Sequence, residues 1–308
     1  MTMPVDRRDF LRTTGTAVAA GLVLGAGSRT NAKETPAAEH GLRKAVKYTM
    51  IGGDAPIVEK FQMLKELGFE GLDMNIPWNH DEVRAAIDKT GVIVHGVVCY
   101  KNWNKPFSHP DPAVREEGLQ SLLGSIRDAK AYGGSSVLVV PAVVSEEIGY
   151  ADAYTRSQEV MRKALPLAEE LNISLLIENV WNNFLLSPLE LARYIDEFES
   201  PLVGSYFDVG NVVRYAWPEQ WIRILGPRIK KLDIKEYSRE LQNSKGPRSG
   251  FGVELGDGDC NWPAVMQALH EIGYKGWATA EVRGGDRERL ADISARMDRC
   301  FASWKAPA

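Results

Sequence analysis

Cysteine and histidine are both scarce in this sequence. Its 308 residues include three cysteines, Cys99, Cys260 and Cys300, and no two of them form a C-x-x-C pair. A disulfide framework or a cysteine zinc site is therefore not expected, and the cysteines are predicted to be inert packing residues. The five histidines include no pair at a metal-ligand spacing. These absences exclude a small scaffold held together by disulfides.

An excess of positive charge is also absent. The formal net charge is −4 at pH 7, whereas proteins that bind a phosphate backbone usually carry a basic face. A nucleic-acid partner is therefore not expected. What the chain does contain is ordinary for a soluble globular protein, with 44% hydrophobic and 25% charged residues. This length supports a large core, and α/β barrels of ~250 residues form a single domain.

The N-terminal segment has the order of features that marks a twin-arginine export signal. Residues 6–12 (DRRDFLR) contain the pair Arg7 and Arg8, residues 16–27 (TAVAAGLVLGAG) form a weakly apolar run, and small residues precede a cut after Ala32. The apolar run is shorter than the ~20 residues that span a bilayer, so no stable membrane anchor is expected. A disordered tail with an accidental arginine pair is the alternative.

These features predict a signal peptide over residues 1–32, a short linker over 33–45 and one folded domain over 46–308. The mature protein is then expected in the periplasm or another extracytoplasmic compartment.

Beyond residue 40, eight short apolar, β-branched runs alternate with longer amphipathic stretches. The runs are nearly continuous in apolar residues, as in parallel strands that are covered on both faces. Residues 55–67, with Asp54 as the cap and Gly68 as the stop, and residues 152–171 read as helices. The predicted strands are residues 47–53, 71–76, 92–100, 136–144, 173–180, 203–209, 229–236 and 277–283.

Eight such units predict an α/β fold of the single (β/α)8 TIM barrel type. The alternative is an open, doubly wound sheet, but no G-x-G-x-x-G motif follows the first predicted strand. One long irregular segment, residues 238–261, follows the seventh predicted strand and should lie at the barrel mouth, where active sites form. It reads either as a solvated loop or as a lid over a substrate.

Acidic residues end or interrupt the last four predicted strands. Glu178, Asp208, Asp233 and Glu281 all occur within apolar sequence. In a barrel these carboxylates would converge at one rim, where mutual repulsion would raise their pKa values unless a cation lay between them. A single residue of this kind is usually a structural ion-pair partner or a helix cap, but four in register favour a divalent metal site.

The sequence resembles the xylose-isomerase-like TIM barrels, which include sugar isomerases, ketose 3-epimerases, hydroxypyruvate isomerases and apurinic-site endonucleases. The resemblance covers roughly residues 45–304. Its most specific motifs are IEN at 177–179, FDVGN at 207–211, IKKLDIKE at 229–236, GDGDCNW at 256–262 and AEV at 280–282. The resemblance implies one divalent metal ion bound by Glu178, Asp208, Asp233 and Glu281.

Two positions depart from the family pattern. Asp233 stands where the family usually has a histidine ligand, and Asn211 stands where a second histidine often follows the sixth-strand aspartate. An all-oxygen ligand set favours Mg²⁺ or Mn²⁺ over Zn²⁺. Either Asp233 is a true ligand or the site is degenerate and free of metal. The nucleic-acid branch of the family uses several histidine ligands and a basic face, which this chain lacks.

The resemblance implies that the metal polarises a sugar carbonyl while two glutamates act as acid and base. Glu178 would move the proton on one face of the substrate and Glu281 on the other. Lys235 could stabilise an enolate or bind a hydroxyl, and an ordinary ion pair is its structural alternative. Return of the proton to the same carbon gives epimerisation, and return to the neighbouring carbon gives isomerisation. If a leaving group lies β to the carbanion, elimination follows instead.

Further residues are candidates for contacts with a carbohydrate substrate. Trp103 and His109 follow the third predicted strand, Asn211 follows Asp208, and Arg283 lies on the same strand face as Glu281. Alternatively, the aromatic residues of this loop pack as a cover without touching a substrate, and Arg283 forms an ion pair with Asp257 or Glu254. His95, inside an apolar strand, reads as a buried interior histidine.

The leading functional hypothesis is an exported, metal-dependent sugar isomerase or epimerase that acts on a free sugar or sugar derivative. Export disfavours a phosphorylated substrate, since sugar phosphates are made in the cytoplasm. The alternative is a 3-keto-glycoside lyase or hydrolase that uses the same enolisation. A barrel that binds sugars without catalysis is a weaker third reading. A homo-oligomer is also possible from the sequence, which does not determine the oligomeric state.

Overall fold

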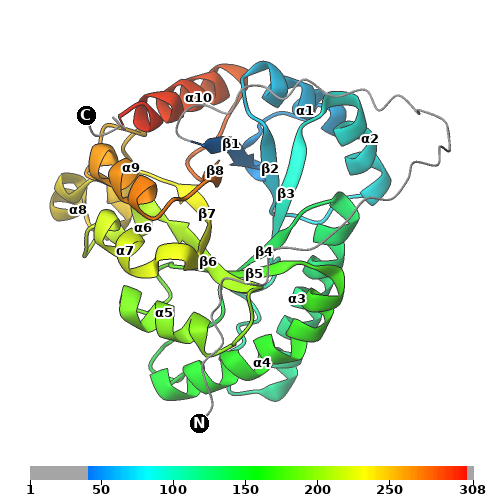
Figure 1. The fold of residues 1–308 in the computed structure, drawn as a ribbon, viewed down its shortest axis with the longest axis vertical. Helices are drawn as coiled ribbons and strands as arrows, with labels where there is room; N and C mark the ends of the chain where they lie inside the picture. Colours follow the sequence, from blue (N-terminus) through cyan, green and yellow to red (C-terminus); the bar gives the residue numbers. More distant parts are fainter. Residues whose placement is uncertain (1–40, 304–308) are drawn as a thin grey trace, which may run out of the picture. The chain divides into compact units, whose positions relative to one another are not determined.

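The computed structural model of the protein describes residues 41–303. The predicted signal peptide and residues 33–40 of the predicted linker lie outside the described residues. Eight parallel strands close into a barrel in which each strand pairs with its neighbours in chain order and β8 pairs with β1 (Figure 1). The strands are β1 (Leu42–Lys47), β2 (Gly71–Met74), β3 (Ile93–Val98), β4 (Ser136–Val139), β5 (Ser174–Glu178), β6 (Val203–Asp208), β7 (Ile229–Ile234) and β8 (Gly276–Ala280). The predicted (β/α)8 barrel is confirmed.

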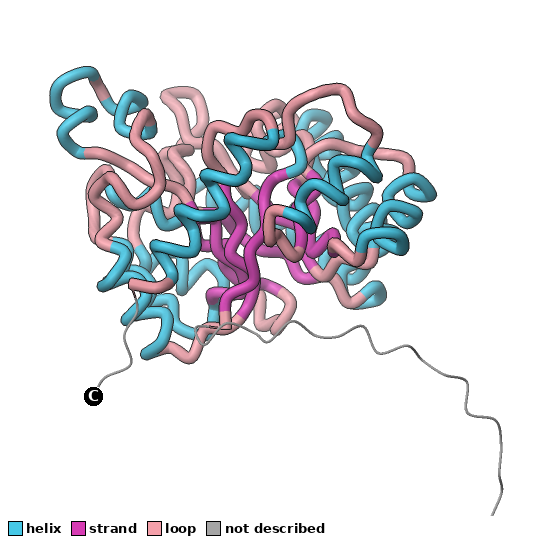
Figure 2. Tube along the Cα trace, turned by 90° about the horizontal axis from the view of Figure 1, so that it is seen from above, coloured by secondary structure: helices cyan, strands magenta, loops and turns pink. Residues whose placement is uncertain are grey.

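Helices follow the strands and surround the barrel, as Figure 2 shows from the side. The longest, α3 and α4, pack against each other outside β3 to β5. The helices are α1 (Ile57–Glu66), α2 (His80–Thr90), α3 (Pro112–Tyr132), α4 (Tyr150–Leu171), α5 (Pro188–Asp196), α6 (Val209–Val213), α7 (Pro218–Leu225), α8 (Arg239–Lys245), α9 (Trp262–Glu271) and α10 (Arg287–Phe301). Among residues 41–303, no helix combines the length and hydropathy needed to cross a membrane.

The first strand differs from its prediction. It occupies Leu42–Lys47 instead of residues 47–53, and Tyr48–Met50 forms a short 3-10 helix, η1. The reason lies in the partner strands, because Leu42 to Val46 pair with β8 and Ala45 to Lys47 pair with β2. Residues 42–45, which we assigned to the linker, therefore belong to the barrel.

Two predicted helix bounds also change. Helix α1 begins after Pro56 without a side-chain cap, so Asp54 is not its cap. It ends at Glu66, two residues before Gly68, which has a φ of 80°. Helix α4 begins at Tyr150, two residues before the predicted start. Pro56 fixes a φ of −52°, which prepares the chain for the first turn of α1.

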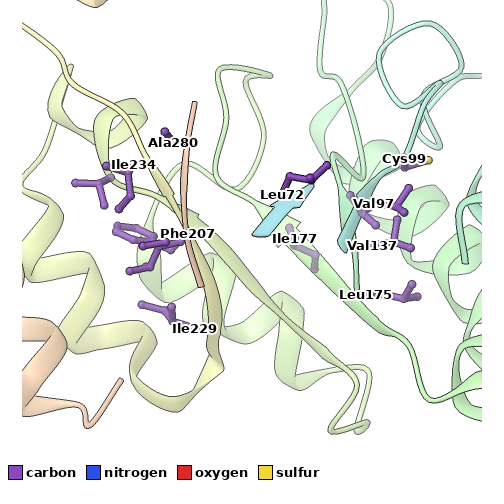
Figure 3. Packing of buried hydrophobic residues seen from close by; sticks show 14 of the residues in the cluster. Leu72, Val97, Cys99, Val137, Leu175, Ile177, Phe207, Ile229, Ile234 and Ala280 are labelled. Atoms are coloured by element: carbon purple, nitrogen blue, oxygen red, sulfur yellow. The ribbon is translucent and has the colours of Figure 1, made fainter. Parts of the chain in front are cut away.

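The main hydrophobic core lies between the strands and the helices. Figure 3 shows part of this layer, where Leu72, Val97, Val137 and Ile177 project from their strands. These four side chains have no exposed surface. Burial of branched aliphatic side chains on the outer faces of most strands explains why these strands read as apolar runs in the sequence.

The inside of the barrel is strongly polar. Buried polar side chains inside it include Lys47, Asp73, His95 and Lys231, each at most 4% exposed. A bulge in the pairing of β2 with β3 makes room for them, because Leu72 pairs with Val94 but Asp73 pairs with Gly96. His95 is thus an extra residue of β3 without a partner in β2, and such bulges redirect the side chains around them.

The segment 238–261 is an ordered structure that two side chains hold in place. It contains α8 and a 3-10 helix, η3 (Pro247–Phe251). The Tyr237 hydroxyl lies 2.7 Å from both Gln242 Oε1 and the Pro247 carbonyl oxygen. The Glu236 carboxylate accepts hydrogen bonds from the backbone N–H groups of Gly256 and Cys260 and from the indole of Trp262. The GDGDCNW motif is therefore a structural loop built around Glu236.

Candidate metal centre

Four carboxylates meet at the carboxyl end of the barrel, as the sequence predicted. Glu178 ends β5, Asp208 ends β6, Asp233 lies in β7, and Glu281 follows β8 directly. One oxygen of each lies within 4.8 Å of one oxygen of every other. The first three residues are buried and Glu281 is partly buried. The Glu281 backbone N–H donates to the Ile234 carbonyl, which holds this carboxylate against β7.

Two lysines compensate part of the negative charge. Lys235 Nζ lies 2.8 Å from Asp208 Oδ2 and 3.1 Å from Glu281 Oε2. Lys47 Nζ lies 2.8 Å from Asp233 Oδ1 and 3.0 Å from its Oδ2. Four carboxylates and two ammonium groups leave an excess of two negative charges in this small volume.

The pKa values show how this crowding affects the cluster. Burial, together with the charge of Glu281, raises the pKa of Glu178 to about 8. Burial also raises the pKa of Asp208 and, much further, that of Asp233, in spite of the lysines. Burial opposes ionisation of Glu281 too, but Lys235 and Lys47 outweigh it and lower its pKa. Without a cation, the cluster resists full ionisation.

The cluster has the chemistry of a divalent cation site. Within the described part of the chain, Asp208 Oδ2, Asp233 Oδ1 and Glu281 Oε2 are buried and accept no well-formed hydrogen bond, although each lies within 3.1 Å of an ammonium group. Buried carboxylate oxygens of this kind are the ligands that Mg²⁺ and Mn²⁺ prefer. The residues present therefore fit one such ion.

Two asparagines contact residues of the carboxylate cluster. Asn179 binds the backbone of Asp208 on both sides, since its Nδ2 donates to the carbonyl and its Oδ1 accepts from the N–H. Asn211 Nδ2 lies 3.4 Å from Glu178 Oε1, and its Oδ1 lies 3.4 Å from Lys235 Nζ. Asn211 therefore contacts both a carboxylate of the cluster and Lys235.

An aromatic wall adjoins the cluster on the side of Lys235. The Trp181 indole donates to the Asn211 carbonyl, and its ring lies 4.8 Å from that of Phe251. Lys235 Nζ lies 5.4 Å from the centre of the Phe251 ring. Phe251 ends η3, so the segment 238–261 supplies part of this wall. The prediction that this segment lies at the barrel mouth is consistent with that contact.

A hydrogen-bonded network lies inside the barrel beneath the cluster. Lys231 Nζ lies 2.9 Å from His95 Nδ1, and burial holds the pKa of His95 well below its usual value. The neutral ring then accepts at Nδ1 and donates from Nε2 to Thr279 Oγ1, 3.2 Å away. The Tyr206 hydroxyl donates to Asp73 Oδ2, so Thr279 must donate to Tyr206. His95 is a satisfied interior histidine, as predicted.

Three predicted substrate contacts lie apart from this arrangement. Among residues 41–303, Trp103, His109 and Arg283 form no hydrogen bond or ion pair with the four carboxylates. His109 Nδ1 accepts from the Asp111 backbone at the start of α3, and Trp103 is 50% exposed. Their roles toward a substrate stay predictions.

The alternative partners suggested for Arg283 are occupied by other arginines. Glu254 pairs with Arg289, and Asp257 pairs with Arg296.

Sequence reasoning missed Lys47, Asp73 and Asn179. A signal was present, because Lys47 and Asp73 are charged residues in apolar runs, the same feature that identified the carboxylates. Asn179 stands next to Glu178 in the IEN motif but was not assigned a role of its own.

The chain belongs to the xylose isomerase-like TIM barrel family, whose sequence model matches residues 61–300. Among curated proteins, it is similar to the L-ribulose-5-phosphate 3-epimerase UlaE of Escherichia coli O1:K1. The identity is 23% over 261 residues, which span 78% of this chain and 89% of the relative. It is also similar to a 2-epi-5-epi-valiolone 7-phosphate 2-epimerase of an Actinoplanes species, with 28% identity over 49% of this chain and 53% of the relative.

Solved structures share the fold at low sequence identity. The 3-keto-D-glucoside 4-epimerase YcjR of E. coli has a TM-score of 0.71 and 16% identity, over 85% of this chain and 99% of that one. The D-psicose 3-epimerase of Clostridium cellulolyticum H10 has a TM-score of 0.70 and 15% identity, over 86% of this chain and all of that one (100%). The resemblance predicted from the motifs is therefore confirmed at the level of family and fold.

Proposed function

We propose that this protein is a divalent-metal-dependent sugar epimerase or isomerase that moves a proton at a carbon next to a carbonyl. The observation that carries the proposal is the convergence of Glu178 and Glu281, from β5 and β8, in one carboxylate cluster. When bound, the ion would supply polarisation of the substrate carbonyl and stabilisation of enediolate charge. Glu178, Asp208, Asp233 and Glu281 would hold it.

The two glutamates would act as base and acid. One takes the proton from the substrate carbon and the other returns a proton, in either direction. Binding of a sugar without catalysis would not need two such groups. Lys235 lies between Asp208 and Glu281 and places a positive charge where an enolate oxygen would develop. Asn211 would orient Glu178 and Lys235 toward each other.

The related proteins favour epimerisation over isomerisation as the outcome. Both sequence relatives are named as epimerases of phosphorylated substrates, and both structural relatives are named as epimerases. We keep a free sugar as the proposed substrate, since the N-terminal segment favours export, and the test must include a phosphorylated ketose. The wall formed by Trp181 and Phe251 suits the apolar C–H face of a sugar ring.

A 3-keto-glycoside lyase or hydrolase is the second candidate. Large apolar side chains are exposed on the connections after β3, β5 and β6 and in the first turn of α5, at the end of the barrel that holds the cluster, and could receive an aglycone. They are Trp103, Leu186, Leu189, Tyr215 and Trp217. The relative YcjR is named as acting on a 3-keto-D-glucoside, and the same enolisation would expel a leaving group β to the carbanion.

The test follows solvent deuterium by NMR. The purified protein is incubated in D₂O with Mn²⁺ or with EDTA and with D-psicose, D-tagatose, L-ribulose 5-phosphate and a 3-keto-glucoside. Metal-dependent deuterium next to a carbonyl, with an epimeric product, supports the proposal, and release of an aglycone supports the second candidate. Binding of a sugar without any exchange would favour the non-catalytic barrel and overturn both.

Variants assign the exchange to the cluster. Glu178→Gln and Glu281→Gln should each slow exchange by about 10²–10⁴-fold. Glu254→Gln removes an exposed carboxylate that pairs with Arg289 outside the cluster, so it serves as the matched control and should exchange at the wild-type rate.

A further inference from the structure

Lys47 occupies an unusual place beneath the carboxylate cluster. It is the last residue of β1 and is 3% exposed. Its ammonium group contacts both oxygens of Asp233, at 2.8 and 3.0 Å, and lies 3.3 Å from Asp73 Oδ2. The centre of the Tyr206 ring lies 4.5 Å from the same nitrogen. These contacts confine the ammonium group to one position between the cluster and the barrel interior.

Lys47 differs from Lys235 in what it can reach. Lys235 is 17% exposed at its side chain and contacts Asn211 and the aromatic wall, so it faces the side from which a substrate would enter. Lys47 is enclosed by Asp73, Tyr206 and Asp233. A substrate contact is therefore a poor explanation for Lys47.

The formal charges of the buried side chains in and beneath the cluster can be summed. Asp73 and Lys231 lie in the network beneath the cluster and offset each other. The four carboxylates, Lys47 and Lys235 then leave an excess of two negative charges. One divalent ion would make the buried site neutral. Without Lys47 the excess would be three, which matches a trivalent ion.

We propose that Lys47 is a positioning residue that holds Asp233 toward the cluster and acts as an internal counter-ion, so that the site selects an ion of two positive charges. The inference rests on the proposed function, because it concerns the ion that the cluster binds. Lys47 is a fixed cation near the site, and its repulsion acts more strongly on a trivalent than on a divalent ion. Asp233, at the position where the family usually has a neutral histidine, needs this counter-charge.

The experiment measures the dissociation constants of Mn²⁺ and Tb³⁺ for the purified full-length protein by calorimetry and by Tb³⁺ luminescence. The selectivity is the ratio of the Mn²⁺ constant to the Tb³⁺ constant. Lys47→Met should raise this ratio about tenfold or more, because it removes one positive charge near both ions. Lys44→Met is the matched control, since Lys44 lies on the same strand but pairs with Asp298 on the outer side. Its ratio should equal that of the wild type.

A second pair of variants keeps the test valid if Lys47→Met does not fold. Asp233→Asn reduces the excess to one negative charge, so its ratio should fall about tenfold below that of the wild type. Adding Lys47→Met to Asp233→Asn removes both partners of the ion pair and restores an excess of two. The ratio of the double variant should return to the wild-type value, while both ions bind more weakly because one ligand is lost.

Two results overturn the proposal in different ways. If wild type binds Mn²⁺ but the Lys47→Met substitution leaves the ratio unchanged in both backgrounds, Lys47 has only a structural role and the proposed function stands. If wild type binds neither ion, the proposed metal dependence and this inference both fail.

Discussion

Asn179 forms two hydrogen bonds with the backbone of Asp208. Its Nδ2 donates to the Asp208 carbonyl at 2.8 Å, and its Oδ1 accepts from the Asp208 N–H at 2.9 Å. Both residues are buried, and each ends or follows a neighbouring strand of the barrel. These two hydrogen bonds join β5 to β6 at the point where the Glu178 and Asp208 side chains leave their strands.

Loss of these two hydrogen bonds should affect both the stability of the fold and the affinity for a metal ion. Asn179→Ala leaves two buried backbone groups unpaired, which should cost about 2 kcal/mol of unfolding free energy. It should also weaken Mn²⁺ binding, because Asp208 is no longer held in place. Urea unfolding and calorimetry measure the two effects. Asn243→Ala, at an exposed position in α8, should change neither, and equal effects of the two substitutions would contradict this role.

The space at Gly96 should be essential for the interior network. A Cβ atom there would lie 2.5 Å from Asp73 Oδ1 and 3.0 Å from Lys231 Nζ. Gly96→Ala should therefore lower the unfolding free energy by about 2 kcal/mol. Gly124→Ala in α3 meets no atom within 4 Å, and should stabilise the protein by about 0.5 kcal/mol. Denaturant unfolding of both variants checks the contrast, and a tolerated Gly96→Ala would show that the network can shift.

His95 should make stability depend on pH in the acidic range. Burial holds its native pKa well below the ordinary value of 6.5, so the unfolded chain takes up a proton below pH 6.5 that the native chain does not. The unfolding free energy therefore falls as the pH falls through 6.5, by roughly 1 kcal/mol between pH 7.5 and 5.5 from this residue. His95→Gln removes the effect.

The measurement is the difference in unfolding free energy between wild type and the glutamine variant at both pH values. The advantage of the wild type should shrink by roughly 1 kcal/mol at pH 5.5. A difference that stays constant with pH would mean that the native protein protonates His95.

The N-terminal segment predicts export through its paired arginines. Replacing Arg7 and Arg8 with lysine should leave a full-length precursor in the cytoplasm, whereas Arg29→Lys, outside the pair, should be exported and cut after Ala32. Cell fractionation and intact mass measure both results. Equal export of the two variants would show that this segment does not act as a twin-arginine signal.

The sequence was sufficient to predict the barrel and the convergence of the four carboxylates, for one physical reason. Strands that are covered on both faces are apolar, so Glu178, Asp208 and Asp233 stand out against their surroundings, and parallel strands bring their ends together. The bounds of β1 were harder, because residues 42–47 include three charged residues and residues 47–53 have the more continuous apolar run. Pairing with β2 and β8 selects residues 42–47. That error placed Lys47 at the start of a strand instead of its end.

The interior network was not predictable from local patterns. Lys47 and Asp233 are 186 residues apart in the chain, and nothing near either residue indicates the other. Lys231 is one of several charged residues in residues 229–236, and no feature near Asp73 connects it with Lys231. Only the closed barrel, with a bulge at His95, shows that these side chains face one another.

The central claim is that one divalent ion in this cluster supports proton exchange at a substrate carbon. The most direct test adds Mn²⁺ stepwise to EDTA-treated protein in D₂O, with a ketose that proves to be a substrate, and follows deuterium incorporation. We predict that the rate rises linearly and becomes constant at one Mn²⁺ per chain. Exchange at the full rate before any Mn²⁺ is added, or none at any ratio, would contradict the claim.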